Sequence, residues 1–369
     1  PLLEEIVVTA TKREALLGDV PLSVVAIDGR RLLETNIQSM QALGSYVPNM
    51  SMAETGIGNH IAIRGIFSGE NPGFEQSVGT YVDGIYRGRG QQARGLFFDL
   101  QRVEVLRGSQ SILFGKNSIA GALNITTARP TDVAEGYLQA TIESDTGEQE
   151  YVGAISGPLS PTLSVRVAAR YRSQDGHIDN LTLSLDEPQR DESSARVTLA
   201  WEAPNDFDVL FKAEVGRFDV TGREIEILNE LPAEVGPFTG LRYADILQVF
   251  GQDPSVANVT QDFARSANGD FSNNDFRELV LSITRPICDL EITANTGYSE
   301  YEFNELCDCD FTGGYVFKAG FEEQFEQFSQ ELRLTSPADQ TISYIAGVYF
   351  ETRELDFFDT LFVNDTSVI

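Results

Sequence analysis

The sequence predicts a small α+β domain followed by part of an antiparallel transmembrane β-barrel. Residues 1–130 mix short helix and strand patterns that glycines separate. After Pro130 the helix signals end, and long segments of alternating apolar and polar residues take over. The connections between these segments tend to be short and long in turn, as in barrels of the bacterial outer membrane. A soluble β-sandwich gives no reason for such segregation.

The first domain begins with a strand and two short helices. Residues 22–27 alternate like a strand, and Asp28 is placed to cap a helix that starts at Gly29. Residues 39–46 predict a second short helix, which Pro48 stops. Further short strands are expected at 60–64, 79–82, 103–107 and 123–127.

About nine strands of roughly ten residues are expected after Pro130, which is the length that a tilted strand needs to cross a bilayer. In one of them Val165 and Val167 point one way, while Arg166 and Arg170 point the other. Short turns are expected at 158–162, 204–206 and 337–340, and long connections at 173–192, 219–275 and 303–324. Short turns of such barrels face the periplasm, so the long loops would lie outside the cell.

Composition excludes several classes of protein. The 369 residues are 41% hydrophobic and 10% aromatic, which is typical of a folded protein and not of a disordered one. No run of eighteen apolar residues is present, which excludes a membrane-spanning helix. A net charge of -29 argues against nucleic acid as a partner. Solvated acidic loops are the favoured explanation of this charge, and binding of cationic ligands or divalent ions is the alternative.

The cysteines and histidines do not predict a metal site. A disulfide between Cys307 and Cys309, or free thiols, is favoured over a soft-metal site, because His60 and His177 are the only histidines and no CxxC occurs. Cys288 is the third cysteine. No Gly-x-Ser-x-Gly, HExxH or Walker motif occurs, so we expect no enzyme, no catalytic residue and no cofactor.

Five segments in a fixed order carry the strongest signal. They read EEIVVTA at 4–10, PLSVV at 21–25, IRG at 63–65, YVDGIY at 81–86 and DLQRVEVLRGSQSILFGKNSIAGALNITTARP at 99–130. This series resembles the TonB-dependent receptors of the Gram-negative outer membrane. The chain departs from the family pattern at Ser109, where proline is common, and at Ala120, where a second glycine is common.

The resemblance implies three parts. Residues 1–15 would hold the TonB box and a flexible N-terminal segment, residues 16–130 the plug domain, and residues 131–369 the N-terminal part of a barrel that has 22 strands in the family. About nine strands cannot close around a plug, so we expect a longer receptor. The chain starts without a signal peptide, which suggests a mature form. A monomer in contact with outer-membrane lipid is expected.

The resemblance also implies a function. These receptors actively transport a scarce nutrient, here a ferric siderophore or similar chelate, or else cobalamin, a saccharide or another small organic compound. TonB, with the inner-membrane energising complex, would engage the TonB box and move the plug. The box would comprise Glu5, Ile6, Val7, Val8, Thr9 and Ala10. An ordinary terminal strand is the alternative for this segment, and a passive porin or a surface adhesin is the alternative function.

Two further sets of residues follow from the resemblance. Plug–barrel ion pairs are expected from Arg64, Arg102 and Arg107, with Glu331 as the barrel partner; the alternative is that the arginines cap sheet ends within the plug. The ligand would bind at the plug apex and the extracellular loops. The apex candidates are Phe67, Glu70, Phe74, Gln76, Arg87, Arg89, Gln91, Gln92 and Arg94. Their arginines could hold an anionic group, but pairing with an acidic barrel wall is slightly favoured.

Overall fold

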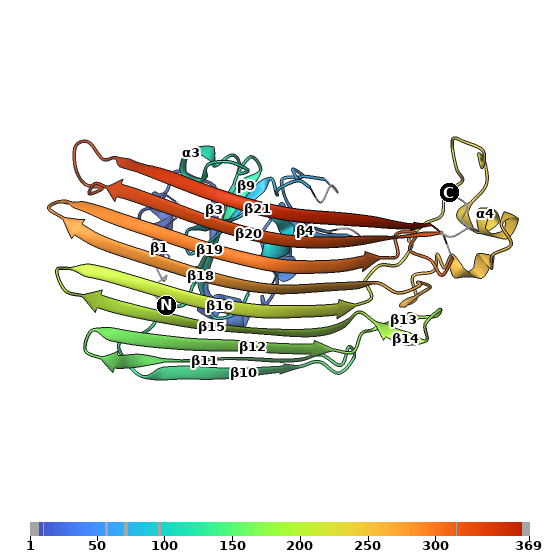
Figure 1. Cartoon of the computed structure of the whole chain (residues 1–369), viewed down its shortest axis with the longest axis horizontal. Helices are drawn as coiled ribbons and strands as arrows, with labels where there is room; N and C mark the ends of the chain where they lie inside the picture. Colours follow the sequence, from blue (N-terminus) through green and yellow to red (C-terminus); the bar gives the residue numbers. More distant parts are fainter. Residues whose placement is uncertain are drawn as a thin grey trace.

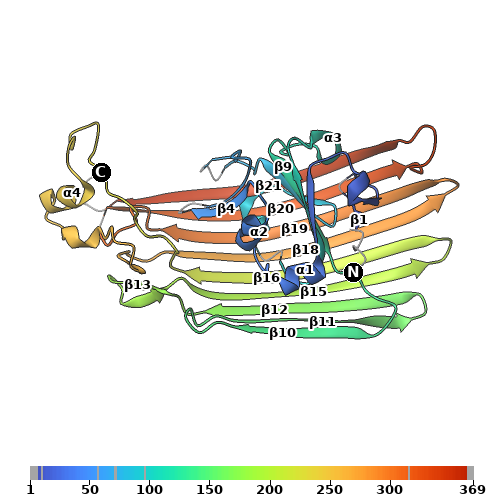
Figure 2. The ribbon, with the colours of Figure 1, turned by 180° about the vertical axis from the view of Figure 1, so that it is seen from behind.

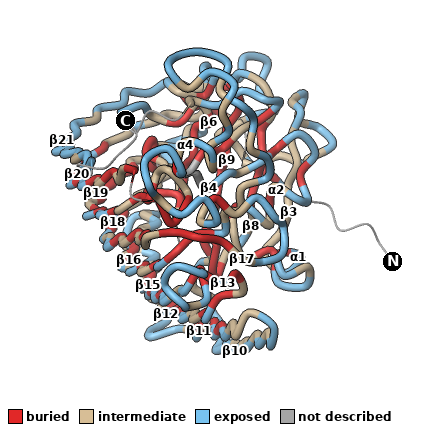
Figure 3. The backbone as a smooth tube through the Cα atoms, turned by 90° about the vertical axis from the view of Figure 1, so that its right-hand side faces the viewer, coloured by how far each residue is buried: buried red, intermediate tan, exposed pale blue. Residues whose placement is uncertain are grey.

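A curved wall of nine antiparallel strands holds a smaller N-terminal domain on its concave side (Figures 1 and 2). Figure 3 looks along the strands and shows the wall curving around that domain. The computed structural model describes residues 7–9, 11–55, 58–69, 73–94, 97–314 and 316–363. The predicted α+β domain and open antiparallel barrel segment are therefore confirmed.

The N-terminal domain is built on a five-stranded sheet, with two two-stranded ribbons (β1–β2 and β4–β5) and short helices beside it. The main sheet has the order β3 (Val24–Asp28), β8 (Leu100–Arg107), β9 (Gly121–Thr127), β6 (Val78–Val82) and β7 (Ile85–Arg87). The other elements are β1 (Val7–Val8), β2 (Ala15–Leu16), η1 (Leu17–Asp19), α1 (Gly29–Glu34), α2 (Met40–Tyr46), β4 (Met50–Thr55), β5 (Gly58–Ile63), η2 (Gly90–Ala93) and α3 (Ser111–Phe114).

Local capping explains where the predicted helices begin. The Asp28 side chain accepts a hydrogen bond from the Arg31 N–H at 2.9 Å, and the Ser39 side chain accepts one from the Ala42 N–H at 3.1 Å. Leu43 on α2 is then fully buried against the sheets. The domain thus has an apolar core of its own, separate from the wall.

The wall has the reverse polarity of a soluble sheet. Along β12, Arg166 and Arg170 are buried towards the N-terminal domain, while Val167 and Tyr171 are exposed on the outward face. The strands are β10 (Glu135–Ile142), β11 (Gln149–Ser160), β12 (Leu163–Gln174), β15 (Gln189–Ala203), β16 (Phe207–Thr221), β18 (Phe271–Ile287), β19 (Leu290–Cys307), β20 (Phe317–Thr335) and β21 (Ile345–Val363). None of the described helices is long and apolar enough to cross a membrane.

Most wall strands are longer than the expected ten residues, and the longest have 19. Their outward faces change from apolar to charged along their length. The cross-strand row of Leu279, Tyr298 and Phe328 is followed by the row of Arg277, Glu300 and Glu326. The sequence expectation stopped at the apolar stretch, whereas the hydrogen-bonded ladder continues beyond it.

The connections gather at two ends of the wall (Figure 1). The turn end has connections 161–162, 204–206, 288–289 and 336–344, and the loop end has 143–148, 175–188, 222–270 and 308–316. The loops contain β13 (Ile178–Asn180), β14 (Leu185–Glu187), α4 (Tyr243–Val249), η3 (Pro254–Val256) and β17 (Ala264–Arg265). The three long connections are shorter than expected because the strands extend into them, whereas connection 336–344 is longer than the expected turn 337–340.

Gly121 provides a test of the close contact between β8 and β9. A Cβ at this position would stand 2.3 Å from the Leu106 carbonyl oxygen, which is backbone and cannot rotate away. We expect Gly121→Ala to lower the free energy of unfolding of the N-terminal domain by about 2 kcal/mol. Denaturant-dependent protease cleavage of that domain in the full receptor measures this. Gly18→Ala is the control, because its Cβ meets nothing within 4 Å; equal losses in both variants would refute the steric explanation.

Candidate functional site

A buried chain of ion pairs joins the β6–β7 hairpin to the wall. The Asp83 carboxylate accepts a hydrogen bond from the Lys212 ammonium of β16 at 2.6 Å. Lys212 is 1% exposed and also lies 3.4 Å from Glu278 of β18. Arg87 of β7 forms an ion pair with the same Glu278. One hairpin of the N-terminal domain therefore contacts two neighbouring strands.

The turn of this hairpin places Asp83 by its backbone geometry. Asp83 and Gly84 both have positive φ, +49° and +82°, as a two-residue hairpin turn of this kind requires. Asn295 donates to the Asp83 carbonyl oxygen at 3.1 Å. Burial would raise the pKa of Asp83, but Lys212 and the Thr127 N–H lower that pKa to about 2. The carboxylate is therefore ionised at neutral pH.

Two more junctions lie on either side of this hairpin. Arg89 lies 3.0 Å from Glu323 of β20, and the Tyr301 hydroxyl donates to the same carboxylate at 2.6 Å. Asp99 accepts a hydrogen bond from Arg166 of β12 at 2.8 Å. These contacts spread the attachment of the N-terminal domain over the wall from β12 to β20.

The expected pairing of Arg64, Arg102 and Arg107 with Glu331 is not found among the described residues. Glu331 lies 3.2 Å from Arg333, two residues along the same face of β20.

Arg102 is paired inside the N-terminal domain. Arg102 lies 2.8 Å from Glu104, again two residues along one strand face. The backbone N–H groups of Arg64 and Arg107 donate to the backbone carbonyls of Asn49 and Ser23 at 2.7 and 2.9 Å.

The first apex loop leaves two aromatic side chains open to solvent. Phe67 is 49% and Phe74 is 59% exposed. Gln76 is instead buried, and its side-chain oxygen accepts from the Ile61 N–H at 3.2 Å. Glu70 lies outside the described residues. Of the described candidates in this loop, the two phenylalanines are thus the ones that a ligand could contact.

The second apex loop lies against the wall. Arg87 and Arg89 have the carboxylate partners given above, as the favoured interpretation expects. The Gln92 side chain donates to Ser299 at 3.3 Å, and Gln91 accepts from Asn274 at 3.1 Å through its carbonyl. The Arg94 guanidinium lies 5.6 Å from the centre of the Phe303 ring. In this arrangement these contacts attach the loop to the wall, and Arg87 and Arg89 pair with wall carboxylates.

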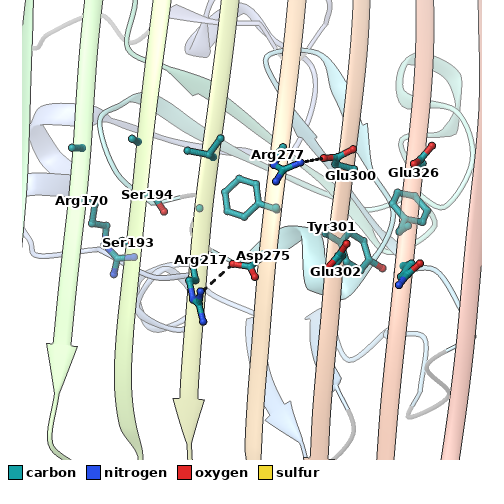
Figure 4. A pocket seen from close by; sticks show the side chains of 17 residues that line it. Arg170, Ser193, Ser194, Arg217, Asp275, Arg277, Glu300, Tyr301, Glu302 and Glu326 are labelled. Carbon is teal, nitrogen blue, oxygen red and sulfur yellow. Dashed lines mark hydrogen bonds and ion pairs between the residues drawn. The ribbon is translucent and has the colours of Figure 1, made fainter.

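A cavity of about 800 Å³ runs along the wall and is drawn in Figure 4. Its outward part carries ion pairs between neighbouring strands, Arg277 to Glu300 at 3.0 Å and Arg217 to Asp275 at 3.9 Å. The apex-loop candidates do not line it. The cavity therefore adds nothing to the predicted ligand site.

The expected TonB box, residues 5–10, is ordered where the structure describes it. Val7 and Val8 form β1, which pairs with β2, and Val8 is fully buried. The Thr9 N–H donates to Glu104 at 2.7 Å. Glu5, Ile6 and Ala10 lie outside the described residues. The flexible segment expected from the sequence is thus docked on the N-terminal domain at Val7, Val8 and Thr9.

Three connections at the loop end form one folded unit. Strand β13 of loop 175–188 pairs in parallel with β17 of loop 222–270. Buried Arg265 joins them, at 2.7 Å from Asp270 and 3.6 Å from Glu187. The Asp308 N–H of loop 308–316 donates to Asp270, so the third loop shares this carboxylate.

Asp308 is a buried acid at the centre of that unit. It lies between Cys307 and Cys309, whose sulfurs are bonded to each other in the structure. Its carboxylate accepts from the Asn268 N–H at 2.7 Å. Burial, with smaller contributions from Asp310 and Asp270, raises the pKa of Asp308 to about 7. The described residues contain no group of three or more His, Cys, Asp or Glu that could hold a metal ion.

Asp83→Asn should weaken the attachment of the N-terminal domain, because it removes the closest partner of a fully buried lysine. We expect a loss of about 3 kcal/mol in the free energy of unfolding. The measurement is the denaturant midpoint of the full receptor. Arg217→Gln is the control: it breaks the pair with Asp219, in which Arg217 is 63% exposed, and should cost about 0.5 kcal/mol or less. Equal midpoints for both variants would show that the Asp83–Lys212 pair does not stabilise the attachment of the N-terminal domain to the wall.

Asp308 predicts a pH dependence of the loop unit. Its folded pKa lies above its unfolded value near 4, so the unit should be most stable below pH 4, lose stability as the pH rises towards 7, and then stay constant. We expect a difference of about 4 kcal/mol between pH 4 and pH 8, because a shift of one pKa unit corresponds to about 1.4 kcal/mol. Hydrogen exchange at 308–316, corrected for intrinsic rates, measures it, and Asp308→Asn should abolish it. Asp289→Asn, at the turn end, is the control; a pH dependence that survives Asp308→Asn would exclude this acid as its source.

Comparison with known proteins identifies the N-terminal domain. The family model described as TonB-dependent Receptor Plug Domain matches residues 17–122. The pesticin receptor of Yersinia pestis is 26% identical over 246 residues, which are 62% of this chain and 36% of that protein. The ferrichrome outer membrane transporter/phage receptor of Escherichia coli strain K12 is 31% identical over 134 residues, 33% of this chain and 16% of that protein.

The fold has solved counterparts. The ferric yersiniabactin uptake receptor of Yersinia pestis superposes with a TM-score of 0.73 at 19% identity, covering 93% of this chain and 50% of that one. This chain thus spans about half of that receptor. The plug match, the related receptors and the shared architecture show that the chain belongs to the TonB-dependent receptors, of which it carries the plug domain and nine strands of the barrel.

Proposed function

We propose that the receptor containing this chain actively takes up a scarce small nutrient across the bacterial outer membrane, driven by TonB. The observation that carries the proposal is the folded plug, which lies inside the wall and is attached to it mainly by ion pairs. Charge-assisted pairs hold a definite orientation and can exchange partners with water when the plug moves. A passive porin needs an open lumen, which a docked plug does not leave.

The apolar side chains on the outward face of the wall support the proposal that the wall lies in the lipid of the outer membrane. Exposed apolar side chains from successive strands form a band there, among them Val167, Val197, Leu279, Phe328 and Val348. Buried polar side chains face the plug instead, as expected when the surrounding solvent is lipid. The turn end would then face the periplasm and the folded loop unit the outside of the cell.

A ferric siderophore or a similar chelate is the proposed ligand class. The related proteins named above include receptors for ferrichrome and ferric yersiniabactin. Exposed Phe67 and Phe74 on the apex loop offer apolar contacts to an organic chelator. Cobalamin, saccharides and other small organic compounds are the competing ligands in a binding assay.

Residues 5–10 are proposed as the TonB box. Ile6, Val7, Val8 and Thr9 are β-branched, which favours the extended backbone that pairs edge to edge with a partner strand. The existing ladder between β1 and β2 supports this tendency. TonB would replace β2 or extend the ladder from its other side.

Val8→Pro tests this function. Proline removes a backbone donor and fixes φ, so we expect uptake of labelled ferric siderophore by cells to fall to background while binding stays within about twofold. Val8→Ala keeps the donor and should retain most of the uptake. Normal uptake by Val8→Pro with intact binding would exclude this segment as the TonB box. Uptake that persists without proton-motive force would favour a passive porin.

A further inference from the structure

Thr9 sits in a polar pocket formed by three side chains of the main plug sheet, which we call the Thr9 pocket: Arg102, Glu104 and Asn124. The Thr9 N–H donates to Glu104 Oε1 at 2.7 Å. The Thr9 hydroxyl oxygen accepts from Arg102 Nη2 at 2.9 Å and from Asn124 Nδ2 at 3.1 Å. Both the backbone and the side chain of Thr9 are therefore held.

Glu104 is the centre of this pocket. Its side chain is 0% exposed. Arg102 Nε donates to Oε1 at 2.8 Å, and Asn124 Nδ2 donates to Oε2 at 2.8 Å. A buried carboxylate is tolerated only with such partners, and Arg102 and Asn124 would remain if Thr9 left. The Glu104 carboxylate would therefore keep hydrogen-bond partners after Thr9 leaves the pocket.

The pocket opens towards the turn end of the wall. Thr9, Arg102 and Asn124 line a cavity of about 1590 Å³ that is also lined by residues of the turns 161–162 and 336–344. A segment leaving the pocket would enter this space, and water could replace its hydrogen bonds. The departure of Thr9 therefore requires no opening of the apolar plug core.

The chain just after Thr9 is anchored separately. Lys12 lies over the Tyr81 and Phe114 rings, 5.4 and 5.0 Å from their centres. Arg13 donates to the carbonyl oxygens of Ser336 and Tyr344 at 2.6 and 2.7 Å. These contacts hold the start of the plug on the wall, so residues 7–9 can detach while residues 12–13 stay in place.

We propose that Glu104 is a positioning residue that keeps Thr9 docked and thereby sets how often residues 7–9 are available to a partner protein. The inference rests on the proposed function, because it concerns the segment assigned to TonB. A partner strand that pairs with this segment needs its backbone donors, and the Thr9 N–H is occupied by Glu104 in the docked state. Docking on Glu104 and pairing through that donor therefore exclude each other.

The experiment measures how fast a cysteine at position 8 reacts in the full-length receptor, because Val8 is fully buried while the segment is docked. Val8→Cys is introduced together with Cys288→Ser, because Cys288 is an exposed free cysteine. Open outer-membrane fragments are treated with a membrane-impermeant maleimide, without TonB or ligand. Glu104→Gln should raise the labelling rate roughly tenfold, because it removes the charge from the hydrogen bond to Thr9.

Thr9 itself offers a matched pair of variants. Thr9→Val keeps the shape but removes the hydroxyl that Arg102 and Asn124 contact, so labelling should rise several-fold. Thr9→Ser keeps the hydroxyl and should label at the parent rate. Lys116→Gln is a remote control, because Lys116 contacts Glu351 of β21 at 2.8 Å and is 45% exposed.

Rates within twofold of the parent for both Glu104→Gln and Thr9→Val would overturn the proposal. A second reporter, Val105→Cys, detects unfolding of the plug, because Val105 is completely buried. If that reporter reacts in Glu104→Gln, the plug of this variant has unfolded, and the comparison of Thr9→Val with Thr9→Ser then tests the proposal. Faster labelling in Thr9→Val alone supports the pocket, and equal labelling refutes it. Labelling that responds as expected in a receptor that shows no TonB-dependent uptake would overturn the proposed function and leave the positioning role intact.

Discussion

The polar interface between plug and wall is the constraint on which the rest of the structure depends. A wall surrounded by lipid turns its apolar residues outward, so its inner face must be polar. The plug meets that face with charged side chains of its own, and Asp83, Lys212 and Glu278 show how closely the charges are matched. Each buried charge requires a partner, which fixes the position of the plug more narrowly than apolar packing would.

This arrangement separates two kinds of stability. The plug folds around its own apolar core, with Leu43, Ile61 and Leu123 fully buried. Its attachment to the wall uses mostly ion pairs and hydrogen bonds, together with a small apolar contact of Phe98 with Val152 and neighbouring residues. A domain held in this way can shift or rotate as a unit while its core remains intact, provided that water or new partners satisfy the exposed charges.

Local patterns predicted the elements well and the long-range pairs poorly. Asp28 and Ser39 stand at helix starts because capping depends on neighbours within three residues. Alternation likewise revealed the nine strands. The partner of Arg102 depends on strand register, which no local pattern encodes; Arg102 lies beside Glu104, and Glu331 lies beside Arg333. Lys212 could have been noticed, because a lysine on the inward set of a membrane strand needs a carboxylate opposite it.

The charged outward rows beyond the apolar band determine how far the receptor projects. Strand β19 has 18 residues, which at about 3.3 Å per residue span roughly 60 Å. Tilted by about 40°, such a strand rises about 45 Å, whereas the apolar band of these barrels is about 25 Å tall. The loop unit therefore stands on a hydrated collar above the hydrocarbon, so a ligand meets a preformed protein rim before it comes near the lipid.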